Sequence, residues 1–253
     1  MPDASAKAAR RTRDRDAAQI APRPEHHHRD IDRGTARAAV FGVSDGLVSN
    51  VSLILGVAGA DPGAGFVRLA GLAGLIAGAV SMAAGEYVSM KAQTELFERE
   101  LELERRELHR NPHVETVELT QIYQSRGVDP DKARELAEQM MADPDMALQT
   151  HAREELGIDP DKLGSPTGAA VSSFFAFAIG AFVPLLPWFI GSGTAAVVAS
   201  IVLGAVASVV VGTLLARFTG RSVVFSAARQ LAIAVVAAGV TFLVGHAVGV
   251  GVS

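Results

Sequence analysis

The chain has 253 residues, of which 49% are hydrophobic and 20% are charged, and its formal net charge is −4. It contains no cysteine, which excludes disulfides, thiolate metal sites and cysteine nucleophiles. The charged residues concentrate in two blocks, 1–37 and 91–162. The rest consists of apolar stretches long enough to cross a bilayer, which takes about 20 helical residues. The sequence therefore predicts an all-α integral membrane protein.

The first predicted segment is a polar arm over residues 1–35. It mixes both charge signs with proline and has few large apolar side chains, which is typical of a disordered segment. His26, His27 and His28 lie in this arm. We interpret them as part of a solvated tail, with contact to a metal ion as the alternative.

Five transmembrane helices are expected, two of them in residues 36–91 and three in residues 164–253. The flanking Lys and Arg residues set their orientation, because positive charge stays on the cytoplasmic side. Nine such residues lie in the charged block 1–37, so the N-terminus is expected in the cytoplasm and the C-terminus on the opposite side. Two prolines, Pro184 and Pro187, predict a break near the outer end of the third span. The expected spans are 36–60, 66–90, 167–190, 194–215 and 223–250.

Residues 92–163 form an acidic insert between the second and third spans. They contain 18 acidic and 9 basic side chains, a net charge of −9. The insert begins without Gly or Pro, which favours one long helix that leaves the membrane. Further helices are expected between Pro112 and Gly127, after Asp129 as an N-cap, and up to Gly157. We predict a small helical metal-binding domain on the cytoplasmic side.

Three polar residues stand out in the first two spans: Asp45, Met82 and Glu86. A charge at the centre of a span costs about 2.5–3.5 kcal/mol, so acids there usually have a function. Met82 and Glu86 are four residues apart and share one helix face. Two carboxylates and a thioether favour a site for a divalent transition metal. The alternatives are a helix cap for Asp45, core packing for Met82 and an interfacial position for Glu86.

Acidic side chains in the insert recur three and four residues apart, the spacing with which helical bundles build carboxylate metal sites. The alternative is a solvated helix face, in which Arg99, Arg105 and Arg106 balance the acids. Spacing alone does not choose between these interpretations. The candidate residues are Glu100, Glu104, Glu107, Glu115, Glu118, His151, Glu154 and Glu155.

Three stretches carry a resemblance to a known family: FGVSDGLVSNVSLILG at 41–56, AGAVSMAAGEYVSMKAQTE at 77–95 and REELGID at 153–159. Together with the five-span layout they resemble the vacuolar iron transporter family, including its yeast, plant nodulin-like and bacterial members. The resemblance covers roughly residues 30–250. It implies a homodimer in a lipid bilayer that exports Fe²⁺, and also Mn²⁺, from the cytosol in exchange for protons, for iron storage or detoxification.

The resemblance also implies roles for individual residues. The family's pathway aspartate and methionine fall on Asp45 and Met82, and Glu86 is a further candidate for the pathway. The ions, Fe²⁺ or alternatively Mn²⁺ or Zn²⁺, are cargo, and no permanently bound cofactor, nucleic-acid partner or enzymatic activity is expected. We expect a bacterial plasma membrane as the location.

The family's metal-binding carboxylates fall on Glu104, Glu107, Glu115, Glu118 and Glu155.

The sequence departs from the family pattern at two places. Gly74 stands where some members carry another carboxylate, and Glu86 is the residue that could compensate. His151 and Ala152 stand where some members have paired methionines; imidazole is a competent ligand, whereas alanine is not.

Two rival functions stay open at this point. One is a membrane-anchored iron-binding or iron-oxidising protein, against which stand Asp45 and the lack of the paired E-x-x-H motifs of di-iron bundles. The other is a permease for a non-metal solute.

Overall fold

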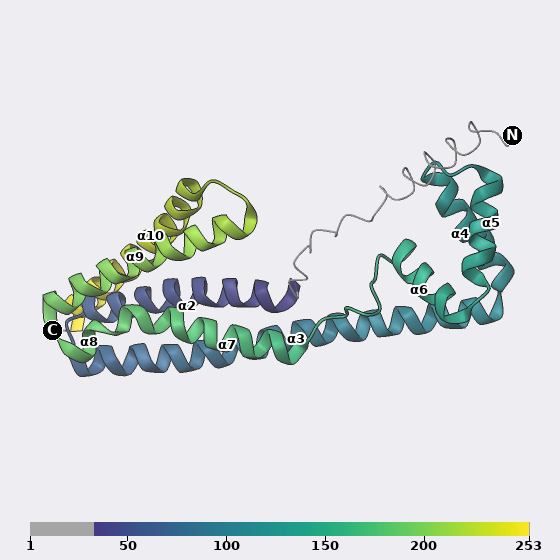
Figure 1. Ribbon diagram of the computed structural model, residues 1–253. Helices are drawn as coiled ribbons and strands as arrows, with labels where there is room; N and C mark the ends of the chain where they lie inside the picture. The colour runs from purple at the N-terminus through teal and green to yellow at the C-terminus, as the bar shows by residue number, and fades with distance from the viewer. Residues whose placement is uncertain (1–32, 253) are drawn as a thin grey trace, which may run out of the picture. The chain divides into compact units, whose positions relative to one another are not determined.

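The computed structural model describes residues 33–252 of the chain, with side chains over residues 34–248, and this part contains helices and no strand (Figure 1). The predicted arm, including the three histidines, lies outside the described residues except for its last three, which begin the first helix. The elements are α2 (Arg33–Gly59), α3 (Ala64–Arg110), α4 (Pro112–Ser125), α5 (Pro130–Met141), α6 (Pro144–Glu154), α7 (Pro166–Phe182), η1 (Val183–Leu185), α8 (Pro187–Ile190), α9 (Gly193–Thr219) and α10 (Val223–Val252).

Five helices in the described part are long and apolar enough to cross a membrane, as the sequence predicts. The third is interrupted where the two prolines predict a break. There α7 gives way to the short 3-10 turn η1, and α8 follows it. Proline has no backbone N–H to donate a hydrogen bond, and its ring clashes with the preceding turn. A regular helix therefore does not continue through both positions. The five segments are Gly34–Gly59, Ala64–Arg110, Pro166–Leu185, Gly193–Thr219 and Val223–Val248.

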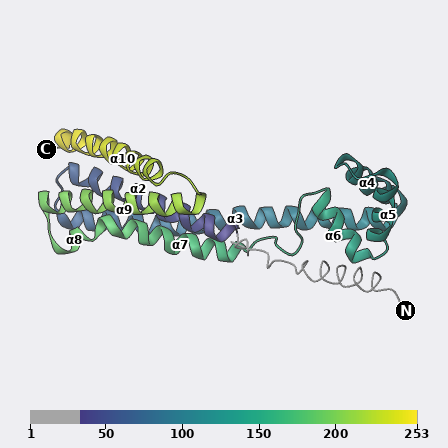
Figure 2. The ribbon, with the colours of Figure 1, turned by 45° about the horizontal axis from the view of Figure 1, so that its top comes forward.

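Helix α2 is the hub of the membrane part. It contacts α3, α7, α9 and α10, and both ribbon views show α2 and α7 side by side along the first part of α3 (Figures 1 and 2). Glycines permit this approach. A Cβ added to Gly42 would lie 2.8 Å from the carbonyl oxygen of Ser173, and one added to Gly46 would collide with the carbonyl of Phe177. Small residues let the backbones of membrane helices approach this closely. Such close packing stabilises the helix pair, because in lipid the hydrophobic effect does not drive helices together.

Buried polar side chains tie the spans together. Asn50 Nδ2 donates to the Ala181 carbonyl at 2.6 Å, and Ser200 Oγ donates to the Pro184 carbonyl at 2.7 Å. A third bond joins Gln230 Nε2 to Ser44 Oγ at 2.7 Å. Such bonds are valuable in an apolar environment, where an unpaired polar group finds no water. They fix α2 against α7 and α10, and α9 against η1.

The insert is helical, as expected. Helix α3 runs without interruption from the second span to Arg110, and both α4 and α6 contact it. The predicted cap is present, since the Asp129 carboxylate accepts from the backbone N–H groups of Asp131 and Lys132. Asp143 caps α6 in the same way, and α6 ends at Glu154, three residues before Gly157, which has a left-handed φ of 66°.

Candidate functional site

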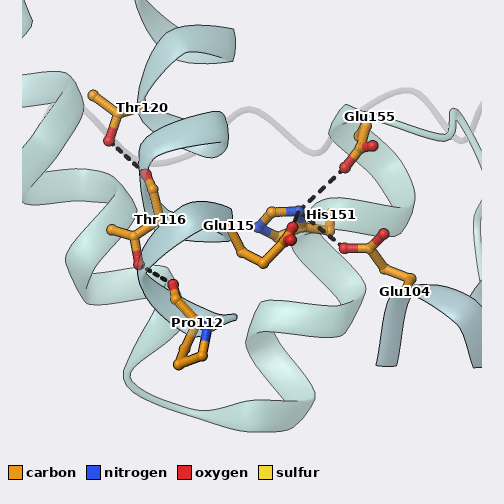
Figure 3. Close-up of polar contacts among 7 residues, drawn as sticks. All are labelled: Glu104, Pro112, Glu115, Thr116, Thr120, His151 and Glu155. Carbon is orange, nitrogen blue, oxygen red and sulfur yellow. Dashed lines mark hydrogen bonds and ion pairs between the residues drawn. The ribbon is translucent and has the colours of Figure 1, made fainter. Parts of the chain in front are cut away.

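Four side chains of the insert converge on one point (Figure 3). They come from three helices and the residue after one of them: Glu104 on α3, Glu115 on α4, His151 on α6 and Glu155 directly after α6. One ligand atom from each lies within 4.8 Å of the others. His151 Nδ1 is 3.1 Å from Glu104 Oε1, 3.3 Å from Glu155 Oε2 and 3.8 Å from Glu115 Oε2. We call these residues the carboxylate–histidine cluster.

Local structure explains why these residues meet. Asn111 ends α3, and Pro112 starts α4 at once, so Glu104 and Glu115 lie on either side of a tight helix–helix turn. His151 and Glu155 are four residues apart at the end of α6 and therefore share a face. The backbone N–H of Glu155 still bonds to the His151 carbonyl at 2.9 Å, which keeps both side chains on the last turn.

The cluster is largely closed to solvent. The exposed fraction is 0% for His151 and 5% for both Glu104 and Glu115, whereas Glu155 lies at the edge. Buried charges are normally paired or coordinate metals, and here three carboxylates share one imidazole. Repulsion among the carboxylates is therefore only partly balanced by the protein itself.

The pKa values of the cluster reflect this crowding. Burial raises the pKa of Glu115, and the negative charge of Glu104 raises it further, while His151 opposes the rise. Burial likewise raises the pKa of Glu155, against a hydrogen bond from His151. For His151, burial is the largest single influence and lowers the pKa. Hydrogen bonds to Glu104 and Glu155, with the charges of Glu104 and Glu115, outweigh burial and leave that pKa raised.

The donor set fits a transition-metal cation. Carboxylate oxygens supply charge and suit Mn²⁺, and imidazole nitrogen favours Fe²⁺ or Zn²⁺ over Mg²⁺ and Ca²⁺. His151 Nδ1 faces the carboxylates, and its buried Nε2 has no hydrogen-bond partner in the described part of the chain. A divalent cation would balance the negative charge of the three carboxylates that meet at His151.

Cation binding by this cluster should weaken as the pH falls. The pKa values of Glu115, His151 and Glu155 are all raised in the folded protein. Without metal, the protonated cluster therefore stabilises the fold at low pH, and this stabilisation is lost as the pH rises through the raised pKa values. A cation must displace the same protons. Thermal stabilisation of the full chain by Mn²⁺ should therefore be larger at about pH 7.5 than at about pH 5.5. An equal stabilisation at both values would contradict protonation of the ligands.

Two of the predicted metal residues lie outside the cluster. Glu107 and Glu118 are exposed, although both are near enough to raise the pKa of Glu115. Glu154 is also outside, since its carboxylate and carbonyl pair with Arg126. The structure thus brings together four of the six metal residues expected from the sequence and its resemblance.

A second site lies between the membrane spans. A cavity of about 430 Å³ opens between α2 and α3, with Phe177 of α7 at its wall. Asp45, Met82 and Glu86 all line it, so the three polar residues singled out in the first two spans share one space. Sequence reasoning missed another polar residue there, Asn50. The signal available for it was an amide in an apolar span, five residues after Asp45.

The two acids of the cavity have different surroundings. Asp45 is partly buried, and its backbone carbonyl accepts a hydrogen bond from Ser49 Oγ at 2.6 Å. Glu86, on α3, lies next to the first turns of α2, where Arg37 Nη2 is 3.7 Å from Glu86 Oε2. Arg37 is mostly exposed, so this end of the cavity carries a solvent-facing positive charge.

The fold and these two sites define a class: a five-helix membrane protein with carboxylates in an intramembrane cavity and a carboxylate–histidine cluster in its insert. The chain belongs to the VIT family, whose sequence model matches residues 36–246.

Several curated relatives are named as vacuolar iron transporters. Vacuolar iron transporter 1 of Oryza sativa subsp. japonica is 30% identical over 236 residues, which cover 92% of this chain and 94% of the relative. Vacuolar iron transporter 1 of Arabidopsis thaliana is 33% identical over 211 residues, 81% of this chain and 83% of the relative. The Acanthamoeba castellanii vacuolar iron transporter is 45% identical over 153 residues, 60% of this chain but only 55% of the relative.

Proposed function

We propose that this membrane protein exports Fe²⁺, and also Mn²⁺, from the cytosol in exchange for protons. Transport of metal ions follows from membership of a family whose relatives are named vacuolar iron transporters. The observation that carries the proposal is the cavity between α2 and α3, because it unites Asp45, Met82 and Glu86 within the membrane spans. Carboxylates are hard ligands and a thioether is a soft one, so together they suit a borderline divalent transition metal.

The carboxylate–histidine cluster would collect the cation. The insert that carries the cluster faces the cytosol in the orientation that the Lys and Arg residues favour. The insert's net charge of −9 raises the local concentration of cations. Glu107 and Glu118, at the margin of the cluster, add to this field without belonging to the four converging residues. Capture here would supply the cavity with cations but need not form part of the membrane pathway itself.

Asp45 and Met82 would hold the cation inside the membrane. A homodimer would place two copies of each ligand around one axis, which makes few side chains per subunit sufficient. Protons provide the return step, because a proton from the far side can replace the departing cation and remove the cost of an unpaired charge in low dielectric. Asp45 and Glu86 are the groups we propose for this exchange.

A membrane-anchored binding protein is the second candidate function. The carboxylate–histidine cluster alone would serve it, since its donor set suits a divalent cation. An anchor has no use for acids in an intramembrane cavity, however, and charged groups there are costly. The cavity therefore favours transport.

Transport into vesicles tests the proposal. Purified protein in liposomes should take up Fe²⁺ kept reduced with ascorbate, and a lumen more acidic than the bath should accelerate uptake while the lumen becomes more alkaline. Collapse of the gradient with a protonophore should remove the acceleration and serves as the control. Uptake that ignores the gradient would argue against proton exchange. Absence of uptake, with cation still bound by the protein, would favour the anchored binding protein.

A further inference from the structure

Asn50 holds an orientation that its hydrogen bond dictates. The residue is 2% exposed, and its Nδ2 donates to the Ala181 carbonyl at 2.6 Å. A carbonyl oxygen only accepts, so the amide nitrogen must face Ala181. The amide oxygen Oδ1, on the other branch of the planar amide, therefore faces a different direction from the nitrogen.

Asn50 Oδ1 is buried and has no hydrogen-bond partner in the described part of the chain. It points towards α3 at Gly74, where an added Cβ would lie only 3.1 Å from it. Both residues line the cavity that contains Asp45. Buried acceptors in proteins are nearly always satisfied, so a buried oxygen without a partner, on a residue that lines a cavity, calls for a ligand.

The position of Asn50 in the cavity follows from how α2 and α3 run. Arg37 of α2 meets Glu86 of α3, whereas Asn50, further along α2, meets Gly74, earlier in α3. The two helices are therefore antiparallel. Asn50 lies five residues beyond Asp45, roughly 7.5 Å deeper from the Glu86 end, given the rise of a helix.

We infer that Asn50 Oδ1 is a neutral ligand for the transported cation, at a second position deeper in the cavity than Asp45. This inference rests on the proposed transport function. Amide carbonyl oxygens ligate divalent cations alongside carboxylates. A neutral oxygen holds a cation less firmly than a carboxylate, and conduction needs sites weak enough to leave. Gly74 presents no side chain beside Oδ1, and the end of Leu53, which occupies the space there, is flexible enough to move aside for a cation.

The competing role for Asn50 is purely structural, as the tie between α2 and α7. Ser200 provides a matched control, because its hydroxyl makes the same kind of buried bond, to the Pro184 carbonyl at 2.7 Å. Asn50→Ala and Ser200→Ala should both lower thermal stability. Only Asn50→Ala should lower kcat/KM for Fe²⁺ uptake into proteoliposomes, by about tenfold or more, the scale seen when metal sites lose a supporting group.

A rescue separates the two roles more sharply. Gly74→Asp introduces a carboxylate beside the position that Oδ1 leaves empty in Asn50→Ala. The added Cβ would press on the end of Leu53, a flexible side chain that can rotate away. Asn50→Ala with Gly74→Asp should regain the larger part of the lost uptake, whereas Asn50→Ala with Gly74→Ala should not. A missing tie to Ala181 would not be repaired by either change.

The outcomes are distinct. The inference is overturned if Asn50→Ala transports as well as Ser200→Ala, or if the carboxylate gives no more rescue than the alanine. Should Asn50→Ala not fold, Gly74→Asp alone leaves the Asn50–Ala181 bond intact and should lower KM for Fe²⁺ relative to Gly74→Ala. An unchanged KM there also overturns the inference. If the wild-type protein takes up no Fe²⁺, the proposed transport function itself fails.

Discussion

Replacing Asp45 by asparagine should abolish proton-coupled Fe²⁺ uptake into proteoliposomes, to less than about a hundredth of the wild-type rate. Asparagine keeps the shape of the side chain but removes the charge that draws a divalent cation into low dielectric. It also removes the acid that would take up the returning proton. Asp45 is the one acidic residue in α2, so no neighbour on that helix replaces it.

The control for this variant is Asp61→Asn. Asp61 is the next acid along the chain, lies in the turn after α2 and does not line the cavity. It has a left-handed φ of 52°, a conformation that asparagine tolerates. Asp61→Asn should transport at the wild-type rate. Both variants should insert, run as the wild type in size-exclusion chromatography and bind Mn²⁺ at the carboxylate–histidine cluster. Wild-type uptake by Asp45→Asn would remove Asp45 from the pathway.

The number and extent of the spans could be predicted because hydrophobic length alone decides them. The long α3 and the Asp129 cap also follow from local rules, the absence of helix breakers and the preference for aspartate before a Pro. Which span lies at the centre does not follow. A helix that is apolar all round gives no direction to its buried face, and α2 became the hub through close backbone contacts at glycines such as Gly46.

The two sites show the same division between local and tertiary information. The spacing of Glu104, Glu107, Glu115 and Glu118 made all four candidates, because residues three apart share a helix face. Only the packing of α3 against α4 and α6 separates the buried pair, Glu104 and Glu115, from the exposed pair. Asn50 was missed because an amide in a span usually serves packing. That its oxygen lacks a partner is known only from the structure, in which the amide nitrogen donates to the Ala181 carbonyl.

Glu115→Gln should make the metal-free protein more stable and its cation binding weaker. The reason is that burial, and after it the negative charge of Glu104, raises the pKa of Glu115, so the carboxylate is held there at a cost. Glutamine removes one negative charge from a buried cluster, and its amide can donate to a remaining carboxylate. Without Mn²⁺ the melting temperature should rise. The affinity for Mn²⁺ should fall by about tenfold or more, since one of the four converging side chains proposed to bind the cation loses its charge.

Glu118→Gln is the matched control, the same substitution at an exposed acid on the same helix, outside the four converging residues. It should change the melting temperature and the affinity for Mn²⁺ little, because water and salt screen an exposed charge. The two quantities come from thermal unfolding and calorimetric titration of the full chain. A metal-free Glu115→Gln protein that melts below the wild type would mean that Glu115 stabilises the fold. Coupled with unchanged affinity, that result would remove Glu115 from the metal site. The predicted pattern, higher stability with weaker binding, is expected where a protein holds like charges together for a cation.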